Sequence, residues 1–238
     1  LRIGNPSRVN DKMLSFTYER RFEGHPAYTE LWGIRKSIRE MGNRMRKSSY
    51  SEREAARSRI NHLRERATEL EIQINEDLFS GARVIASTLV SSNHRILTGR
   101  RFTTLFIDEA AQALEAACWI AIRKADRVIF AGDHCQLPPT IKCIEAARNG
   151  LEQTLMEKVA ANKQETVSLL KVQYRMHQSI MQFSSEWFYQ GELQAAPEVT
   201  NRGILDLDLP MSWIDTSEME FHEEFVGESF GRINKPEA

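Results

Sequence analysis

The chain has 238 residues, of which 41% are hydrophobic and 27% charged, and its formal net charge is −1. These proportions exclude a disordered or collagen-like chain. No apolar run reaches the ~18 residues that a membrane-spanning helix needs, so we expect no membrane partner. Three cysteines without a C-x-x-C pair favour a reducing compartment, and we therefore expect an intracellular protein, cytoplasmic or nuclear.

Charge is distributed unevenly along the chain. Residues 1–70 contain 16 Lys and Arg against 9 Asp and Glu, whereas residues 181–238 contain 3 against 12. A basic first third can attract a polyanion such as nucleic acid. The alternative is a solvated helical face, which needs no partner.

Two segments carry apolar residues at helical spacing. Intervals of three and four residues recur in the series Leu31, Ile34, Ile38, Met41, Met45 and in the series Ala56, Ile60, Leu63, Ala67, Leu70, Ile74. Each series makes a narrow apolar stripe of the kind that two packed helices share. We therefore predict an antiparallel helical hairpin over residues 29–78, with charged outer faces.

Beyond Gly81, short apolar runs alternate with helical stretches. The pattern predicts strands over 82–88, 103–107, 127–131, 167–172 and 211–214, and helices over 110–124, 144–161 and 176–190. The runs lack clean polar–apolar alternation, which is typical of strands buried on both faces of a parallel sheet. This order of elements predicts an α/β fold with right-handed strand–helix–strand units.

Asp108 and Glu109 directly follow the predicted strand that ends at Ile107. Ligands of open parallel sheets bind at the carboxyl ends of the strands. There, one carboxylate can hold Mg²⁺ while its neighbour orients and deprotonates a water molecule. The alternative is structural: Asp108 caps the following helix, and Glu109 favours its positive end.

A second polar loop, residues 132–136 (GDHCQ), follows the next predicted strand and precedes two prolines. Gly132 allows the backbone to approach a ligand, and the Gln136 amide can contact a phosphate oxygen or the water beside it. Asp133 can support a metal site, and the prolines stiffen the loop. An ordinary turn is the alternative explanation.

A third candidate is the stretch 173–177 (QYRMH), which again follows an apolar run. Tyr174 can stack on a base and Arg175 can contact a phosphate, unless they are a core tyrosine beside a surface arginine. The spacing of His134, Cys135 and Cys143 matches no common zinc site, and His177 is expected to be structural. No G-x-x-x-x-G-K-[ST] phosphate loop occurs in the sequence.

Taken in order, residues 108–119 (DEAAQALEAACW), 132–139 (GDHCQLPP) and 173–177 resemble motifs II, III and IV of superfamily 1 helicases. The likeness is to the 5′→3′ branch that includes the nonsense-mediated-decay and immunoglobulin mu-binding helicases, and it extends to residues 2–8 and 146–151. It implies RecA-like domains. Residues 1–28 and 79–166 would form part of the first, 29–78 its helical insertion near the nucleic-acid channel, and 167–238 the start of the second.

The resemblance also implies a role for each matching residue. ATP would be the substrate, with Mg²⁺ on Asp108, Glu109 as general base, Gln136 at the γ-phosphate, Arg175 as arginine finger and Tyr174 on the adenine. Gly132 and Asp133 would belong to the nucleotide-binding loop. Contacts with single-stranded DNA or RNA are implied for Ser87, Thr88, Asn93 and Pro139.

Two parts of such a motor are expected outside these residues: a Walker A loop before Leu1 and further motifs after Ala238. We therefore expect a central piece of an ATP-dependent helicase, with the isolated chain binding ATP weakly or not at all and not hydrolysing it. Two alternatives remain. One is a non-enzymatic nucleic-acid-binding module, and the other is a P-loop ATPase of the DNA-repair type that does not unwind strands.

Overall fold

The computed structural model describes residues 1–45, 50–203, 210–217, 222–227 and 231–235. The chain divides into two compact units, Leu1–Gln164 and Glu165–Ala238, each of which is described by itself. Among the described helices, none combines the length and apolar character that crossing a membrane requires.

The elements of the first unit, in chain order, are β1 (Arg2–Ile3), η1 (Pro6–Arg8), α1 (Asp11–Leu14), α2 (Tyr18–Glu23), α3 (Tyr28–Met45), α4 (Tyr50–Ser80), β2 (Ala86–Ser87), η2 (Val90–Asn93), η3 (Arg95–Leu97), β3 (Phe102–Ile107), η4 (Ala110–Gln112), α5 (Glu115–Ile122), β4 (Ala125–Phe130), α6 (Ile144–Ala146), η5 (Ala147–Leu151) and α7 (Leu155–Asn162). Spanning the boundary and in the second unit are η6 (Gln164–Thr166), β5 (Val172–Gln173), α8 (Gln178–Phe188), β6 (Gln194–Ala195), β7 (Glu224–Phe225) and β8 (Arg232–Ile233).

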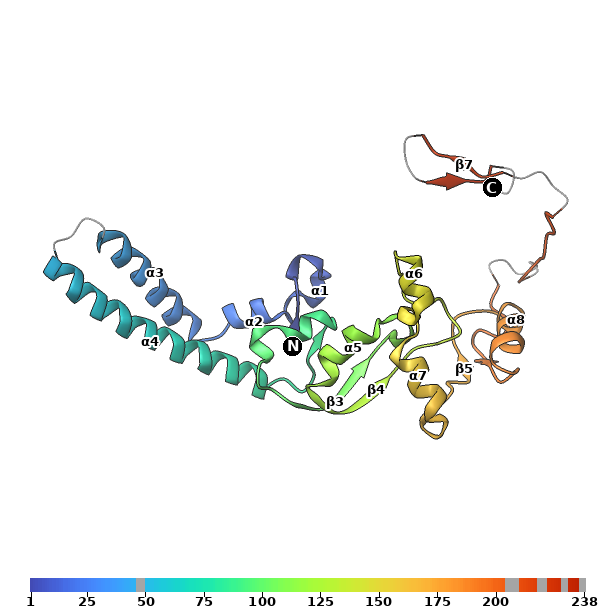
Figure 1. Ribbon diagram of the computed structural model, residues 1–238, viewed down its shortest axis with the longest axis horizontal. Helices are drawn as coiled ribbons and strands as arrows, with labels where there is room; N and C mark the ends of the chain where they lie inside the picture. The colour runs from blue at the N-terminus through green and yellow to red at the C-terminus, as the bar shows by residue number, and fades with distance from the viewer. Residues whose placement is uncertain (46–49, 204–209, 218–221, 228–230, 236–238) are drawn as a thin grey trace. The chain divides into compact units, whose positions relative to one another are not determined.

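Helices α3 and α4 lie side by side and run in opposite directions (Figure 1). Members of both apolar stripes meet in their seam, where Leu31 and Ile74 are fully buried and Leu70 is nearly so. Ion pairs also join the two helices, among them Arg35 to Glu71 at 2.6 Å. The residues between them, 46–49, lie outside the described part of the predicted hairpin.

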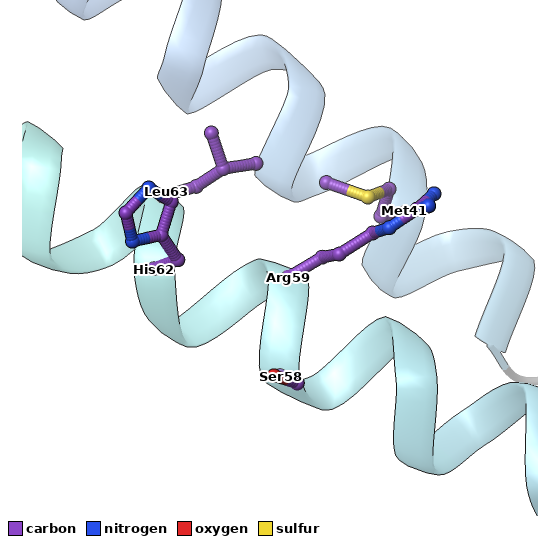
Figure 2. A pocket seen from close by; sticks show the side chains of 5 residues that line it. All are labelled: Met41, Ser58, Arg59, His62 and Leu63. Carbon is purple, nitrogen blue, oxygen red and sulfur yellow. The ribbon is translucent and has the colours of Figure 1, made fainter.

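The seam of this helix pair is open farther along. Figure 2 shows Met41 on α3 facing Leu63 on α4, with Arg59 and His62 beside them. The groove that these side chains line measures about 410 Å³. Met41 and Leu63 are only half-buried here, whereas the buried cluster around Leu31 lies at the other end of the pair.

Strands β3 and β4 form a parallel pair, and α5 makes the crossover between them (Figure 1). Ile107 of β3 packs with Cys118 of α5 and Leu155 of α7 in one core cluster. The expectation that these strands are buried on both faces is wrong within this structure, because α5 and α7 cover one face only. On the opposite face, Phe106 remains 68% exposed.

The described strands form four two-stranded sheets. The pairs β1–β2, β3–β4 and β5–β6 are parallel, and β7–β8 is antiparallel. The structure therefore has the predicted mixture of helices and parallel strands, but the described residues do not make one continuous sheet.

Three predicted strands are corrected. Of residues 82–88 only Ala86–Ser87 is a strand, the run 167–172 becomes a strand only at Val172, and residues 211–214 form none. A strand exists only where a neighbour satisfies its backbone groups. The described partners are as short as the strands themselves, since Arg2–Ile3 pairs with β2 and Gln194–Ala195 pairs with β5.

Two predicted helices are interrupted. Residues 110–124 divide into η4 and α5 because Ala113 and Leu114 are extended. Residues 144–161 divide where Gly150 takes a φ of +93°, a left-handed conformation that glycine adopts readily. Helix α7 then starts anew with a reciprocal cap between Thr154 and Glu157. That Ser/Thr-x-x-Glu signal was present in the sequence and could have located the break.

Candidate active site

The loops that follow β3 and β4 are joined through their backbones. The Ala131 N–H donates to the Ile107 carbonyl at 2.8 Å, and the Ala110 N–H donates back to the Ala131 carbonyl at 2.9 Å. The parallel pairing thus continues past the last strand residues. The acidic pair at 108–109 and the polar loop at 132–136 consequently begin next to each other.

Gly132 makes this close approach possible. A β carbon on Gly132 would lie 2.9 Å from the Ala111 nitrogen, 3.0 Å from the Ala110 nitrogen and 3.0 Å from the Met156 sulfur. Two of these three neighbours are backbone atoms, which cannot rotate away. The site therefore requires glycine for packing between the two loops, a role that the sequence pattern alone did not specify.

Both carboxylates of the acidic pair are exposed to solvent. Oδ1 of Asp108 accepts the Glu109 N–H at 3.1 Å. Glu109 has φ 51° and ψ 40°, the left-handed region that non-glycine residues enter at a cost of about 1–3 kcal/mol. Neither carboxylate caps η4 in the described structure. The helix-capping alternative is therefore not supported by this geometry.

Asp133 organises the second loop. Its Oδ1 accepts the Cys135 N–H at 3.0 Å, and its Oδ2 accepts the Gln136 side-chain amide, Nε2, at 2.9 Å. The Gln136 backbone N–H also donates to the Asp133 carbonyl at 3.2 Å. Burial, together with the nearby Asp133 charge, raises the pKa of the Cys135 thiol. The predicted phosphate-contacting amide is thus held by a carboxylate three residues before it.

Among the described residues, one group of neighbouring side chains has the ligand types that could hold a metal ion. Single ligand atoms of Asp133, His134 and Cys135 lie within 4.8 Å of one another. Asp108 lies outside this group and offers one exposed carboxylate. A carboxylate of this kind suits Mg²⁺, which usually keeps several waters and takes only one or two protein carboxylates.

Two of the predicted nucleic-acid residues, Ser87 and Thr88, line a cavity of about 360 Å³ at the ends of β1 and β2. Arg2 and Asn5 line it too, and sequence reasoning assigned neither of them a role. The Arg2 nitrogen Nη1 is buried without a hydrogen-bond partner. Asn93 is exposed and outside this lining, whereas Pro139 is buried.

In the second unit, Gln173 shapes the turn that carries Tyr174 and Arg175. Its Oε1 accepts the N–H groups of Arg175 at 2.8 Å and Met176 at 2.9 Å, and its Nε2 donates to the Met176 carbonyl at 2.7 Å. Tyr174 is 67% exposed and Arg175 is exposed as well. Sequence reasoning missed the clamp by Gln173, although the residue stands first in the motif.

His177 is structural, as expected. Its Nδ1 accepts the Ser179 N–H at 3.0 Å and so caps the start of α8.

The first unit brings the backbones of the acidic pair and of the loop with Gly132, Asp133 and Gln136 next to each other. Tyr174 and Arg175 belong to the second unit, and their approach to these residues stays a prediction.

Comparison with known proteins identifies the family of the chain. Two protein-family models, each described as an AAA domain, match residues 1–143 and 151–238. The DNA-binding protein SMUBP-2 of Rattus norvegicus is 33% identical over 232 residues, covering 91% of this chain and 24% of that protein. The DNA polymerase alpha-associated DNA helicase A of Saccharomyces cerevisiae is 32% identical over 254 residues, covering 94% and 37%.

A Drosophila melanogaster homolog of the regulator of nonsense transcripts 1 is 36% identical over 168 residues, covering 68% of this chain and 14% of that protein. The chain thus spans from about a seventh to little more than a third of the length of these three relatives. With matching AAA domains, joined acidic and Gly-Asp loops and these relatives, the chain belongs to the superfamily 1 helicases of the group that contains SMUBP-2 and the regulator of nonsense transcripts 1.

Proposed function

We propose that this chain forms the central part of a motor that hydrolyses ATP and moves along single-stranded nucleic acid. The observation that carries the proposal is the backbone junction of the two loops, Ala110 to Ala131 at 2.9 Å. It supports a single phosphate-facing surface made from the acidic pair and the Gln136 loop. The name of one relative, DNA polymerase alpha-associated DNA helicase A, supports the same activity.

In this proposal the Glu109 carboxylate accepts a proton from the attacking water. The water oxygen forms a bond to the γ-phosphorus while the bond to the β–γ bridging oxygen breaks, and ADP leaves with that electron pair. Gln136 donates to a γ-phosphate oxygen or to the water. One N–H of its amide donates to Asp133 at 2.9 Å, so the second N–H would contact the phosphate or the water.

Asp108 would hold Mg²⁺, consistent with its exposed carboxylate at the end of β3. The ion, when bound, neutralises phosphate charge. Arg175 would supply a second positive charge, and Tyr174 would stack on adenine. Their exposure and the Gln173 clamp support both roles, since they leave the side chains accessible on an ordered turn.

We infer that nucleic acid would bind at the β1–β2 end of the first unit. Ser87 and Thr88 line the 360 Å³ cavity there together with Arg2. Phosphate contacts from arginine and hydroxyl groups bind a strand without reading its sequence. Asn93 lies at the end of η2, beside this region in the chain, and Pro139 would act by shaping its loop because its side chain is buried.

The decisive test uses the complete protein, including whatever sequence flanks residues 1–238. Glu109→Gln is expected to abolish ATP turnover while leaving ATP affinity within about twofold, since the amide keeps the shape and loses the base. Turnover at the wild-type rate would remove Glu109 as the base. Arg175→Ala is expected to lower turnover by about 10³-fold. An unchanged rate would remove the arginine finger.

The non-enzymatic alternative rests on one sequence observation, the lack of a phosphate loop within these 238 residues. Residues 1–238 alone are expected to release no phosphate from ATP. Strand-displacement assays on the complete protein separate the alternatives. A binding module shows no turnover, and an ATPase of the repair type shows turnover without displacement.

A further inference from the structure

Helix α7 touches both loops of the candidate active site. The Met156 sulfur lies 3.0 Å from the point where a β carbon of Gly132 would stand. Leu155, the neighbouring residue, packs with Ile107 and Ala110 in the core below the acidic pair. Protein interiors are packed densely enough to transmit small displacements. A movement of the Gly132 loop must therefore displace Met156 or lose contact with it.

A partly exposed polar cluster fastens α7 to α5. Glu115, the first residue of α5, accepts a hydrogen bond from Lys158 Nζ at 2.6 Å and another from Trp119 Nε1 at 3.1 Å. The Lys158 hydrogen bond is the main reason why the pKa of Glu115 lies below its ordinary value. Helix α5 begins six residues after Glu109, directly beyond η4, so this pair ties α7 to the helix that follows the acidic turn and η4.

Helix α7 is also the last helix wholly within the first unit. It ends at Asn162, and the boundary between the units lies between Gln164 and Glu165. The reciprocal cap at its start, with Thr154 N–H to Glu157 at 2.7 Å, makes it an independently started helix rather than a continuation of η5. A movement of α7 therefore also moves the segment that leads into the second unit.

We propose that α7 couples the two nucleotide-facing loops to the second unit, and that Lys158, Glu115 and Met156 are positioning residues for this coupling. The inference rests on the proposed function, because α7 would transmit the effect of nucleotide bound at the two loops. The Lys158–Glu115 pair holds α7 against the acidic-pair side. Met156 lies against Gly132. A rearrangement of the loop that carries Gly132 and Gln136 therefore changes the position of α7 relative to α5.

The test measures ATP turnover of the complete protein with and without oligo(dT) or oligo(U). Lys158→Met keeps the apolar stem and removes the charge. It is expected to leave basal turnover and the KM for ATP within about twofold, and to reduce stimulation by the oligonucleotide by about fivefold or more, the lower end of measured coupling factors. Lys158→Arg is expected to retain stimulation, and Lys12→Ala, an exposed lysine on α1, serves as the matched control.

The outcomes separate two failures. A wild-type protein without ATP turnover contradicts the proposed function itself. Normal stimulation in Lys158→Met, in a protein whose wild type is stimulated, overturns the coupling role alone. A parallel fall of basal and stimulated turnover also overturns it, because that result indicates a merely structural residue. If Lys158→Met does not fold, Glu115→Gln, which keeps size and polarity, takes its place. The ratio of stimulated to basal turnover is then measured and judged by the same criteria.

Discussion

The Gln136 side-chain amide donates from Nε2 to Oδ2 of Asp133 at 2.9 Å, while the other oxygen of Asp133 accepts the Cys135 N–H. One carboxylate thus sets both the course of the loop and the direction of the amide that it carries. In the proposed mechanism, Gln136 is useful only if it is already oriented when phosphate arrives.

Asp133→Ala is accordingly expected to lower kcat of the complete protein roughly ten- to hundredfold with a small change in KM, because misplacing a contacting group by about 1 Å has effects of that size. Steady-state kinetics of Asp133→Ala, Gln136→Ala and the double variant check this. Since both changes remove the Asp133–Gln136 hydrogen bond, their effects should be less than additive in the double variant. Fully additive effects would mean that Asp133 acts independently of Gln136.

Gly132→Ala is expected to destabilise the first unit by about 1–3 kcal/mol, because its β carbon would lie 2.9 Å from the Ala111 nitrogen. Gly33→Ala is the matched control, since no atom lies within 4 Å of its added carbon and it stands inside α3. Removing that helical glycine should stabilise by about 0.5–1 kcal/mol. Urea unfolding followed by circular dichroism measures both, and equal midpoints would contradict the steric argument.

The seam of the α3–α4 pair offers a second matched comparison within one helix. Ile74 is fully buried and Ile72 is 53% exposed. Ile74→Ala is expected to cost about 2–5 kcal/mol, because it empties a packed site, whereas Ile72→Ala should change stability by less than about 1 kcal/mol. Denaturant titration compares the two variants. Similar losses would indicate that the helices do not pack through Ile74.

The Lys158–Glu115 pair predicts a pH dependence of stability. The hydrogen bond from Lys158 lowers the pKa of Glu115, so folding favours the ionised carboxylate. Its contribution is complete above the ordinary glutamate pKa of about 4.3 and is lost as pH falls through the lower, folded value. The stability difference between wild type and Glu115→Gln should therefore shrink below pH ~4. Urea midpoints at pH 7 and below pH 4 check it, and a constant difference would exclude this linkage.

Local patterns anticipated the elements whose partners are close in sequence or strongly patterned. The apolar stripes through Leu31 and Ile74 lie in the α3–α4 seam, and the predicted runs 103–107 and 127–131 overlap β3 and β4, the longest strand pair of the described residues. The predictions failed where the partner strand is short, not where it is distant, since Phe102 pairs with Ala125 and Val172 pairs with Gln194 at similar separations along the chain. Residues 167–171 had the composition of a strand, but only Gln194 and Ala195 lie beside β5, so the strand is no longer than its partner.

The sequence by itself determined which chemical groups are available: two adjacent carboxylates, a Gly-Asp loop with an amide, and a Tyr-Arg turn, each after an apolar run. Only the tertiary structure decided that Ala110 bonds to Ala131, that Gly132 has no room for a β carbon, and that Lys158 reaches Glu115. These contacts join residues 21 to 43 positions apart. Spacing along a chain encodes periodicity within one element, whereas the approach of two elements depends on how all their side chains pack together.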